Sequence, residues 1–234
     1  MSPRYAIYYA PSADTALWRK ASAWLGRDAY SDETLARPAP ADLSGLDLDT
    51  LTADPRGYGF HATLKAPFEL AEASTEADLL DFAARFAAPR APFEVAIAPA
   101  ALGRFLAFRE QQPSADIDKL HGDCVRDFDT FRAPLRDFDL ARRRKAPLTP
   151  EQDARLVAWG YPYVFDDFRF HMTLTGQIRD EDLRERVLAA LRGHFAEETG
   201  PHRFDGIAVF RQADREAPFA ILRRFGFEAA FASA

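Results

Sequence analysis

The sequence has very few of the residues that build disulfides, thiolate metal sites or membrane spans. Cys124 is its single cysteine, which excludes an internal disulfide and a cysteine-rich metal site. No window approaches the ~20 uncharged apolar residues that a transmembrane helix needs. The first twelve residues carry one arginine and no long apolar stretch after it, which a signal peptide would require. We therefore expect a cytoplasmic protein that does not enter a membrane.

The chain also has no excess of positively charged residues. The chain holds 30 Lys and Arg against 36 Asp and Glu, which gives a formal net charge of −6. Proteins that bind nucleic acid mainly through its phosphates normally carry the opposite balance. The composition therefore argues against a long nucleic-acid partner, although a local basic site remains compatible with it. The sequence also contains no glycine-rich phosphate loop of the Walker or Rossmann kind.

Hydrophobic residues, by contrast, are plentiful. They make up 47% of the 234 residues, and 20 of them are phenylalanines. This length and composition are typical of a globular protein with a substantial core. Many of the phenylalanines alternate with other residues in short runs, which favours strands with one buried face.

Two short segments of the chain share four of five positions: FHATL at residues 60–64 and FHMTL at residues 170–174. Side chains alternate between the two faces of a strand. His61 and Thr63 therefore lie on one face, ~6–7 Å apart along the strand, and His171 and Thr173 do the same. The Phe and Leu positions point to the other, core face. Paired histidines on a repeated scaffold suit acid–base catalysis, and the alternative is two surface histidines on pleated strands.

The order of elements around the two segments also repeats. Each segment is followed by the pattern of an amphipathic helix and then by two strand-like runs. Such repetition predicts two similar lobes related by an approximate two-fold axis, here residues 56–132 and 163–230 of a single domain covering 1–234. The order of strands and helices predicts an α+β fold of mainly antiparallel sheet with flanking helices. The expected helices here are 76–88 and 181–195, and the strands are 93–98, 104–109, 203–211 and 219–225.

The rest of the chain gives further local expectations. Capping residues and glycine stops predict a helix from Asp14 to about Leu25 and a short helix opened by Thr149 and Pro150. Proline and glycine content predicts a long loop over 36–57 and a connector over 133–147. The remaining expectations are strands over 5–10, 58–65 and 163–177, the last as one long strand or a bent pair, and a helix over 115–131.

With these two motifs 110 residues apart, the chain resembles the two-histidine (2H) phosphoesterase superfamily, which includes 2′-5′ RNA ligase-like proteins and cyclic nucleotide phosphodiesterases. More closely, the runs 58–68, 159–163 and 170–176 resemble a branch of unassigned proteins encoded with phosphonate-utilisation genes. The resemblance implies a central cleft between the lobes. It also implies that His61 and His171 form the acid–base pair and that Thr63 and Thr173 bind phosphate oxygens. Which histidine is the base stays open.

The same alternation extends each face to further candidates. Lys65 continues the first motif, Arg169 and Thr175 continue the second, and Tyr163 shares their parity further back. A cation beside a phosphate is chemically reasonable, and the alternative for each residue is a solvated strand end. The basic run 142–145 could reach over the cleft and attract an anion. Basic runs in loops are more often solvated connectors.

Together these features predict a phosphoesterase that needs neither a metal nor another cofactor and acts on a small phosphorylated substrate. Two imidazoles with ordinary pKa values near 6.5 can supply both a base and an acid at neutral pH. The expected reaction opens a sugar or nucleotide cyclic phosphate or another small diester, and a link to phosphonate metabolism follows from the resemblance alone. The rivals are an enzyme acting on RNA ends, with 2′,3′-cyclic phosphates or 2′-5′ linkages, and a non-catalytic module that binds a phosphorylated ligand.

Overall fold

The computed structural model describes residues 2–38 and 43–229; residues 39–42 of the predicted loop and residue 230 lie outside it. Its strands form one eight-stranded sheet in the order β6-β3-β4-β5-β2-β1-β7-β8, and each neighbouring pair is antiparallel. This confirms the predicted α+β class with an antiparallel sheet. The strands are β1 Arg4–Tyr9, β2 Ala62–Phe68, β3 Phe93–Leu102, β4 Phe105–Glu110, β5 Met172–Thr173, β6 Gly200–Phe204, β7 Gly206–Gln212 and β8 Phe219–Gly226.

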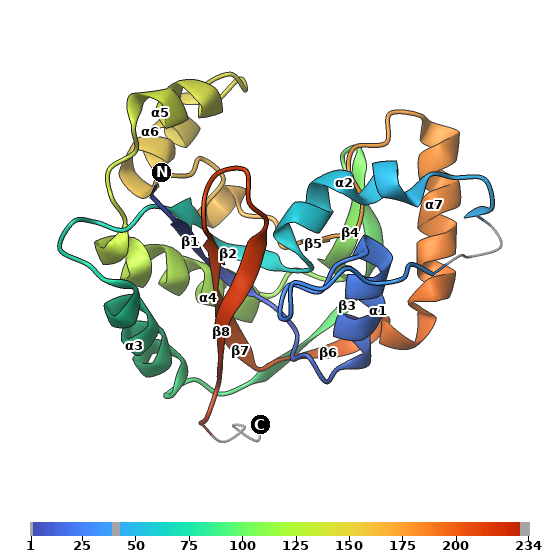
Figure 1. Cartoon of the computed structure of the whole chain (residues 1–234), viewed down its shortest axis with the longest axis horizontal. Coiled ribbons are helices and arrows are strands. Elements are labelled where there is room, and N and C mark those ends of the chain that lie inside the picture. Colours follow the sequence, from blue (N-terminus) through green and yellow to red (C-terminus); the bar gives the residue numbers. More distant parts are fainter. Residues whose placement is uncertain (1, 39–42, 230–234) are drawn as a thin grey trace.

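The helices flank this sheet (Figure 1). α3 packs on β7 and β8, α4 packs on β2, and α7 packs on β3 and β4. Figure 1 shows β2 and β5 in the middle of the molecule, with α5 and α6 on one side of them and α2 and α7 on the other. The helices are α1 Ala16–Leu25, α2 Leu48–Tyr58, α3 Glu76–Ala87, α4 Ala115–Asp127, α5 Asp137–Arg143, α6 Pro150–Trp159 and α7 Glu181–His194, with 3-10 turns at Phe128–Phe131, Phe165–Asp167 and Ala196–Glu198.

The two repeats meet at the centre of the sheet and exchange strands. β2 and β5, which carry the two motifs, are neighbours. β3 and β4 follow β2 in the chain but lie beside β5, whereas β7 and β8 follow β5 but lie beside β1 on the β2 side. Each half of the sheet therefore combines the motif strand of one repeat with a hairpin of the other. The predicted two-lobed antiparallel sheet is present, but the ranges 56–132 and 163–230 do not each form a separate lobe, because their strands are interleaved.

Most helix boundaries follow the capping signals in the sequence. Capping boxes open two of the predicted helices, between Thr75 and Asp78 at α3 and between Thr149 and Gln152 at α6. α1 ends at Gly26 in the left-handed conformation, as expected, but Thr15 rather than Asp14 accepts its N-terminal hydrogen bond. The expected strand over 203–211 is divided into β6 and β7. In the part of the chain that the structure describes, no helix combines the length and apolarity that crossing a bilayer requires.

Two segments expected to be irregular contain helices. α5 lies within the predicted connector, and α2 occupies the end of the predicted loop despite Pro55 in its last turns. Proline has no N–H for the carbonyl four residues earlier. That carbonyl, on Leu51, instead accepts a hydrogen bond of 2.7 Å from the N–H of Gly176, just after β5. Pro55 thus frees the group that docks α2 onto the chain leaving the second motif.

The long strand expected over 163–177 is wrong. Only Met172 and Thr173 pair as a strand, and a 3-10 turn at Phe165–Asp167 interrupts the preceding segment. The aromatic residues in this segment gave a strand-like pattern, although they pack on other elements: the Phe168 ring, for example, stacks on His121 of α4 at a centroid distance of 3.8 Å. Burial still alternates over residues 168–174, and the 3-10 turn ends the strand-like segment before them.

A β-bulge also changes the face of Lys65. Tyr8 pairs with Thr63, but the preceding residue Ile7 pairs with Lys65, so one step along β1 matches two along β2. A bulge of this kind reverses the parity beyond it. Lys65 consequently turns away from the face of Thr63, and its predicted place on that face is wrong.

Lys65 is instead a buried cation beneath α4, with 3% of its surface exposed. Its ammonium group lies 2.8 Å from the Val125 carbonyl and 2.8 Å from Asp129 Oδ1. Arg132 also binds the Asp129 carboxylate. Burial lowers the pKa of Lys65, and its hydrogen bond to Asp129 opposes that shift. The ion pair therefore holds α4 and the 3-10 turn that follows it against β2 rather than serving the site.

This arrangement predicts an asymmetric effect of removing the two partners. Asp129→Ala should lower the free energy of unfolding by about 3 kcal/mol, since it leaves the buried Lys65 ammonium without its counter-ion. Lys65→Met should cost less than about 1.5 kcal/mol, because Met fills a similar volume and Asp129 keeps Arg132. Urea unfolding followed by circular dichroism measures both values. A larger loss for Lys65→Met than for Asp129→Ala would contradict the burial described here.

Candidate functional site

The two motifs face each other across the central strand pair. Ala62 pairs with Met172 in antiparallel register. Continuing that register by one residue in each direction places His61 opposite Thr173 and His171 opposite Thr63. Directly opposed side chains on one face have Cβ atoms about 4.5–5.5 Å apart, and diagonal ones are about 7–8 Å apart. The structure thus brings the four predicted residues into one compact quartet, with the histidines on a diagonal.

Both histidine rings are oriented by the same kind of hydrogen bond to the backbone. His61 Nδ1 lies 2.9 Å from the Gly59 carbonyl, and His171 Nδ1 lies 2.7 Å from the Arg169 carbonyl, in each case two residues earlier. A carbonyl oxygen can only accept a hydrogen bond, so Nδ1 carries the proton in both rings. This leaves Nε2 as the basic nitrogen of each imidazole. Thr63 Oγ1 lies 3.3 Å from His61 Nε2 and donates to it.

The surroundings of His61 favour its neutral form. Its ring stacks on Tyr8 at a centroid distance of 3.9 Å, and the Tyr58 ring is stacked at 6.0 Å. Burial lowers the pKa of His61 to about 4, and the nearby positive charge of His171 contributes to the lowering. The sensitivity of His61 to the charge on His171 agrees with the short separation that the strand register implies.

The pKa of His171 is also lowered, and a different neighbour contributes to the shift. Its ring meets Phe105 edge-to-face at 5.5 Å. Burial lowers the pKa of His171, and the positive charge of Arg109 adds to this effect. Because β4 and β5 pair through Ala107 with Thr173, the same register places Arg109 opposite His171. Arg109 was not among the sequence candidates, since finding it requires the β4–β5 register.

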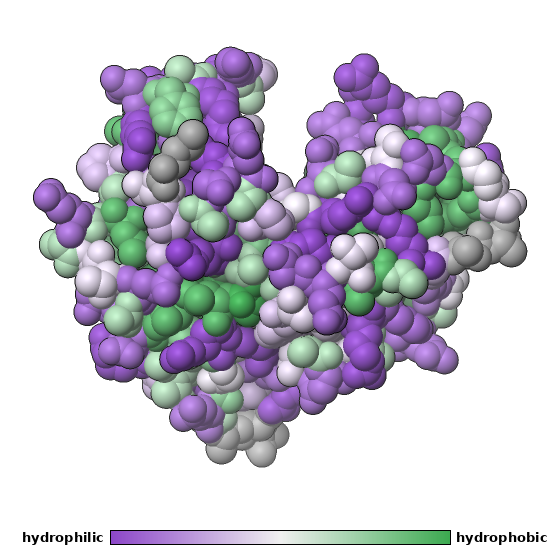
Figure 2. Space-filling view, in the orientation of Figure 1, coloured by the Kyte–Doolittle hydropathy of each residue, from purple (hydrophilic) through white to green (hydrophobic). Residues whose placement is uncertain are grey.

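Two hollows meet at the motifs, and Figure 2 shows the notch between the two sides of the molecule in which they lie. Tyr58, His61 and Thr173 line both hollows. One has a volume of about 230 Å³ and is otherwise lined by Asp54, Pro55, Phe105, Thr175, Gly176 and Gln177. The other has a volume of about 380 Å³ and adds Arg4, Tyr8, Thr63, Ala66, Pro67, Arg142, Arg143 and Tyr161. These sizes suit a small molecule that reaches both ways from His61; His171 itself lines neither hollow.

The other candidates from the sequence have different places. Arg169 contributes its backbone carbonyl to His171, while its exposed guanidinium binds the carbonyls of Asp166 and Phe168. Tyr163 is 39% exposed and lines neither hollow. Tyr163 lies away from the site because the 3-10 turn at Phe165–Asp167 interrupts the segment, and the Arg169 guanidinium is held by the backbone of its own segment. Thr175 lines the smaller hollow, but its hydroxyl accepts from the Leu106 N–H at 3.0 Å and so ties β4 to the chain after β5.

Three tyrosines at the site were missed. Tyr8, Tyr58 and Tyr161 all line the larger hollow. Tyr8 shares the face of Thr63 through strand pairing, and Tyr58 reaches the site because α2 ends there. Tyr161 lies just beyond α6, in the run 159–163 that supported the family resemblance. In the sequence, only the family resemblance could have pointed to any of these tyrosines.

The arginines of the basic run 142–145 lie in different places, some at the site and one at the surface. Arg142 and Arg143, on α5, line the larger hollow. Arg144 binds Asp153 instead, through two hydrogen bonds of 2.7 and 2.9 Å. The solvated-connector interpretation therefore fails for Arg143, which is partly buried, while Arg142 lines the hollow with its side chain 52% exposed.

The residues that the structure describes contain no evident set of metal ligands. Among residues 2–38 and 43–229, no group of three or more His, Cys, Asp or Glu side chains is placed to hold an ion. His121 and Cys124 lie on α4 and are both buried. Burial raises the pKa of the Cys124 thiol, so it stays protonated and inert.

Comparison with solved structures gives likenesses at low sequence identity. A crystal structure of E. coli LigT in complex with 3′-AMP aligns with a TM-score of 0.43 at 13% identity, covering 98% of this chain and 100% of LigT. The TT0787 structure from Thermus thermophilus aligns with a TM-score of 0.42 at 14% identity, covering 98% of this chain and 99% of that one.

Sequence relatives are closer. A protein of Janthinobacterium sp. (strain Marseille) named ribose 1,5-bisphosphate phosphokinase PhnN is 39% identical over 231 residues, covering 96% of this chain and 51% of that protein. The protein of the same name from Laribacter hongkongensis (strain HLHK9) is 35% identical over 224 residues, covering 94% of this chain and 51% of its own length. The chain thus spans about half the length of these curated relatives.

A family model matches residues 63–220, from Thr63 in the first motif through the whole of the second. The match extends over more than half of the sequence and includes most of β2 and the whole of β3 to β7. The chain therefore belongs to the family described as Protein of unknown function (DUF1045).

Proposed function

We propose that this chain is a 2H-type phosphoesterase that opens a small cyclic phosphodiester. The observation that carries this proposal is the β2–β5 register, which opposes each motif histidine to the threonine of the other motif. A single phosphate placed between the two strands could then contact both Nε2 atoms and both hydroxyls. That is the geometry that transfer of two protons around one phosphorus requires.

The proposed reaction balances without any other reactant. A water oxygen attacks phosphorus as one imidazole Nε2 removes its proton. The bond between phosphorus and one ring oxygen breaks, and the other imidazolium gives its Nε2 proton to that oxygen. The product is a phosphate monoester with a free hydroxyl. Thr63 and Thr173 donate hydrogen bonds to the non-bridging oxygens, whose charge grows in the transition state.

The surroundings of the two rings favour one division of these roles. Burial and the positive charge of His171 lower the pKa of His61 to about 4, so His61 is neutral when His171 holds its proton. His61 is then the base, and His171 is the acid. The carbonyls of Gly59 and Arg169 accept from Nδ1–H in both protonation states, so the rings need not turn during the reaction.

For the substrate, we propose a ribose-derived cyclic phosphate. The relatives from Janthinobacterium and Laribacter are named for a kinase of ribose 1,5-bisphosphate, and this chain resembles about half of each. Opening a cyclic phosphate on a ribose yields a ribose phosphate monoester, which is the class of compound in that name. The kinase activity itself is not proposed for this chain.

Removal of either histidine tests the assignment. His61→Ala and His171→Ala should each lower kcat by ~10²–10⁴-fold on ribose 1,2-cyclic phosphate or 2′,3′-cyclic AMP, because each loses one proton-transfer group. Phosphorus NMR follows the opening of the ring, with a chelator present throughout, since the proposed chemistry uses no divalent ion. Arg144→Gln, outside both hollows, is the control. Full turnover by either histidine variant would favour the binding-module alternative.

The lowered pKa values of the two histidines also predict an acidic pH optimum for kcat/KM. His61 must be neutral, which it is above about pH 4, and His171 must be protonated, which its lowered pKa allows only below pH 6.5. The profile should therefore be a bell with its maximum below pH 6.5 and a fall on the alkaline side. A rate that still rises through pH 8 would rule out this pair of roles. In His171→Ala the residual rate should lose the alkaline limb.

A further inference from the structure

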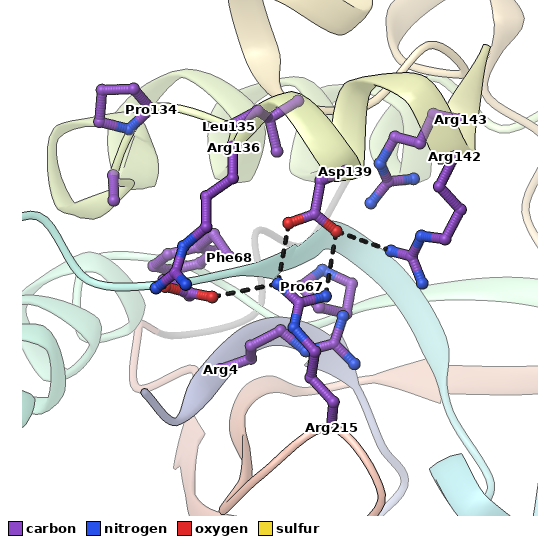
Figure 3. Close-up of a pocket in the computed structure, with 12 residues that line it drawn as sticks. Arg4, Pro67, Phe68, Pro134, Leu135, Arg136, Asp139, Arg142, Arg143 and Arg215 are labelled. Carbon is purple, nitrogen blue, oxygen red and sulfur yellow. Dashed lines mark hydrogen bonds and ion pairs between the residues drawn. The ribbon is translucent and has the colours of Figure 1, made fainter. Parts of the chain in front are cut away.

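The larger hollow carries more positive charge than the proposed reaction uses. Its lining includes Arg4, Arg142 and Arg143 together with His61, and it includes no Asp or Glu. The adjoining depression in Figure 3 holds the same three arginines plus Arg136 and Arg215, against only two carboxylates, Glu69 and Asp139. In a chain with a net charge of −6, this local excess of arginine is a distinct feature.

The two carboxylates are already occupied. Asp139 binds Arg142 at 3.1 Å and Arg215 at 2.8 and 3.0 Å. Glu69 binds Arg215 at 3.1 Å and also binds Arg136. Figure 3 draws the contacts of Asp139 with Arg142 and Arg215 and shows Arg142 and Arg143 pointing from α5 toward the sheet, with Arg4 below them.

Arg4 and Arg143, by contrast, are held by neutral groups. Arg4 Nε donates to Gln212 Oε1 at 2.8 Å, and its guanidinium lies 5.6 Å from the Phe219 ring. The Arg143 guanidinium lies 4.9 Å from the Tyr161 ring, and its buried Nε has no hydrogen-bond partner among the described residues. Neither arginine forms an ion pair within the part of the chain that the structure describes.

Burial without a counter-ion is costly for both groups. Burial lowers the pKa of the Arg4 guanidinium, and the positive charge of Arg215 adds to the shift. Burial likewise lowers the pKa of Arg143. An anion bound between the two would remove this cost, and arginine forks suit the oxygens of a phosphate group.

These charges are set apart from the reacting centre. Arg4 precedes Tyr8 by four residues in β1, and Tyr8 pairs with Thr63. Four residues of strand span about 13 Å. An arginine side chain on that strand therefore approaches the motifs without reaching a phosphate centred between the two histidines.

From this arrangement, and resting on the proposed phosphoesterase function, we propose that Arg4 and Arg143 form a second anion subsite for a terminal phosphate. The substrate class is then a sugar cyclic phosphodiester that carries a phosphate monoester at its far end. The cyclic phosphate lies on the His–Thr quartet, the sugar bridges the larger hollow past Tyr161, and the terminal phosphate reaches the two arginines.

Matched substrates test this selectivity. Ribose 1,2-cyclic phosphate is compared with the same compound bearing a 5-phosphate, by kcat/KM from phosphorus NMR. The wild type should prefer the 5-phosphorylated compound by at least about tenfold, because contacts between charged groups in a partly buried site are worth about that much or more. Arg4→Gln and Arg143→Gln should each reduce the preference several-fold. Arg143→Lys should retain more of it than Arg143→Gln, and Arg144→Gln should leave it unchanged.

A binding measurement separates this proposal from the proposed reaction. Calorimetry compares ribose 1,5-bisphosphate with ribose 1-phosphate, and neither compound needs to be turned over. Tighter binding of the bisphosphate by about tenfold, lost in Arg4→Gln and Arg143→Gln, would support the subsite even if no cyclic phosphate were hydrolysed. Equal affinity of the wild type for the two compounds would overturn the subsite. So would an equal loss of kcat/KM on both cyclic substrates in the Arg4 and Arg143 variants. Neither result would contradict the phosphoesterase function.

Discussion

The site depends on the pairing of β2 with the two-residue strand β5, in which Ala62 lies opposite Met172. A slip of one residue would turn His171 and Thr173 into the core and bring their apolar neighbours out. The flanking side chains oppose such a slip, since Phe60 is fully buried and Phe170 and Leu174 are at most 1% exposed. The Phe and Leu positions repeated in both motifs thus fix the register, and the register places the polar residues.

Other features of the fold complete the site around this pair. Pro55 frees the Leu51 carbonyl for Gly176, which holds α2 against the chain leaving β5 and brings Tyr58 beside His61. The bulge in β2 buries Lys65, so the cations that face the larger hollow come from elsewhere. They come from the start of β1 and from α5, which are far apart in the sequence and become neighbours only in the folded chain.

The sequence predicted the features that depend on local patterns. The repeated motif, the capping boxes of α3 and α6, and the antiparallel sheet could all be inferred from alternation and spacing. The failures arose where distant contacts decide the outcome. Strand parity could not reveal the bulge that turns Lys65, and no local pattern could show that Arg109 lies opposite His171. Helix α2 was missed because proline and glycine content predicted a loop, and the partner of the freed Leu51 carbonyl comes from a distant part of the chain.

The central claim is that both histidines contact one phosphate. The most direct test follows the ring resonances of His61 and His171 by NMR during titration with inorganic phosphate, at several pH values. Both resonances should shift with the same dissociation constant, and both pKa values should rise, because a bound anion favours each imidazolium. Shifts at only one histidine, or two different dissociation constants, would contradict the account.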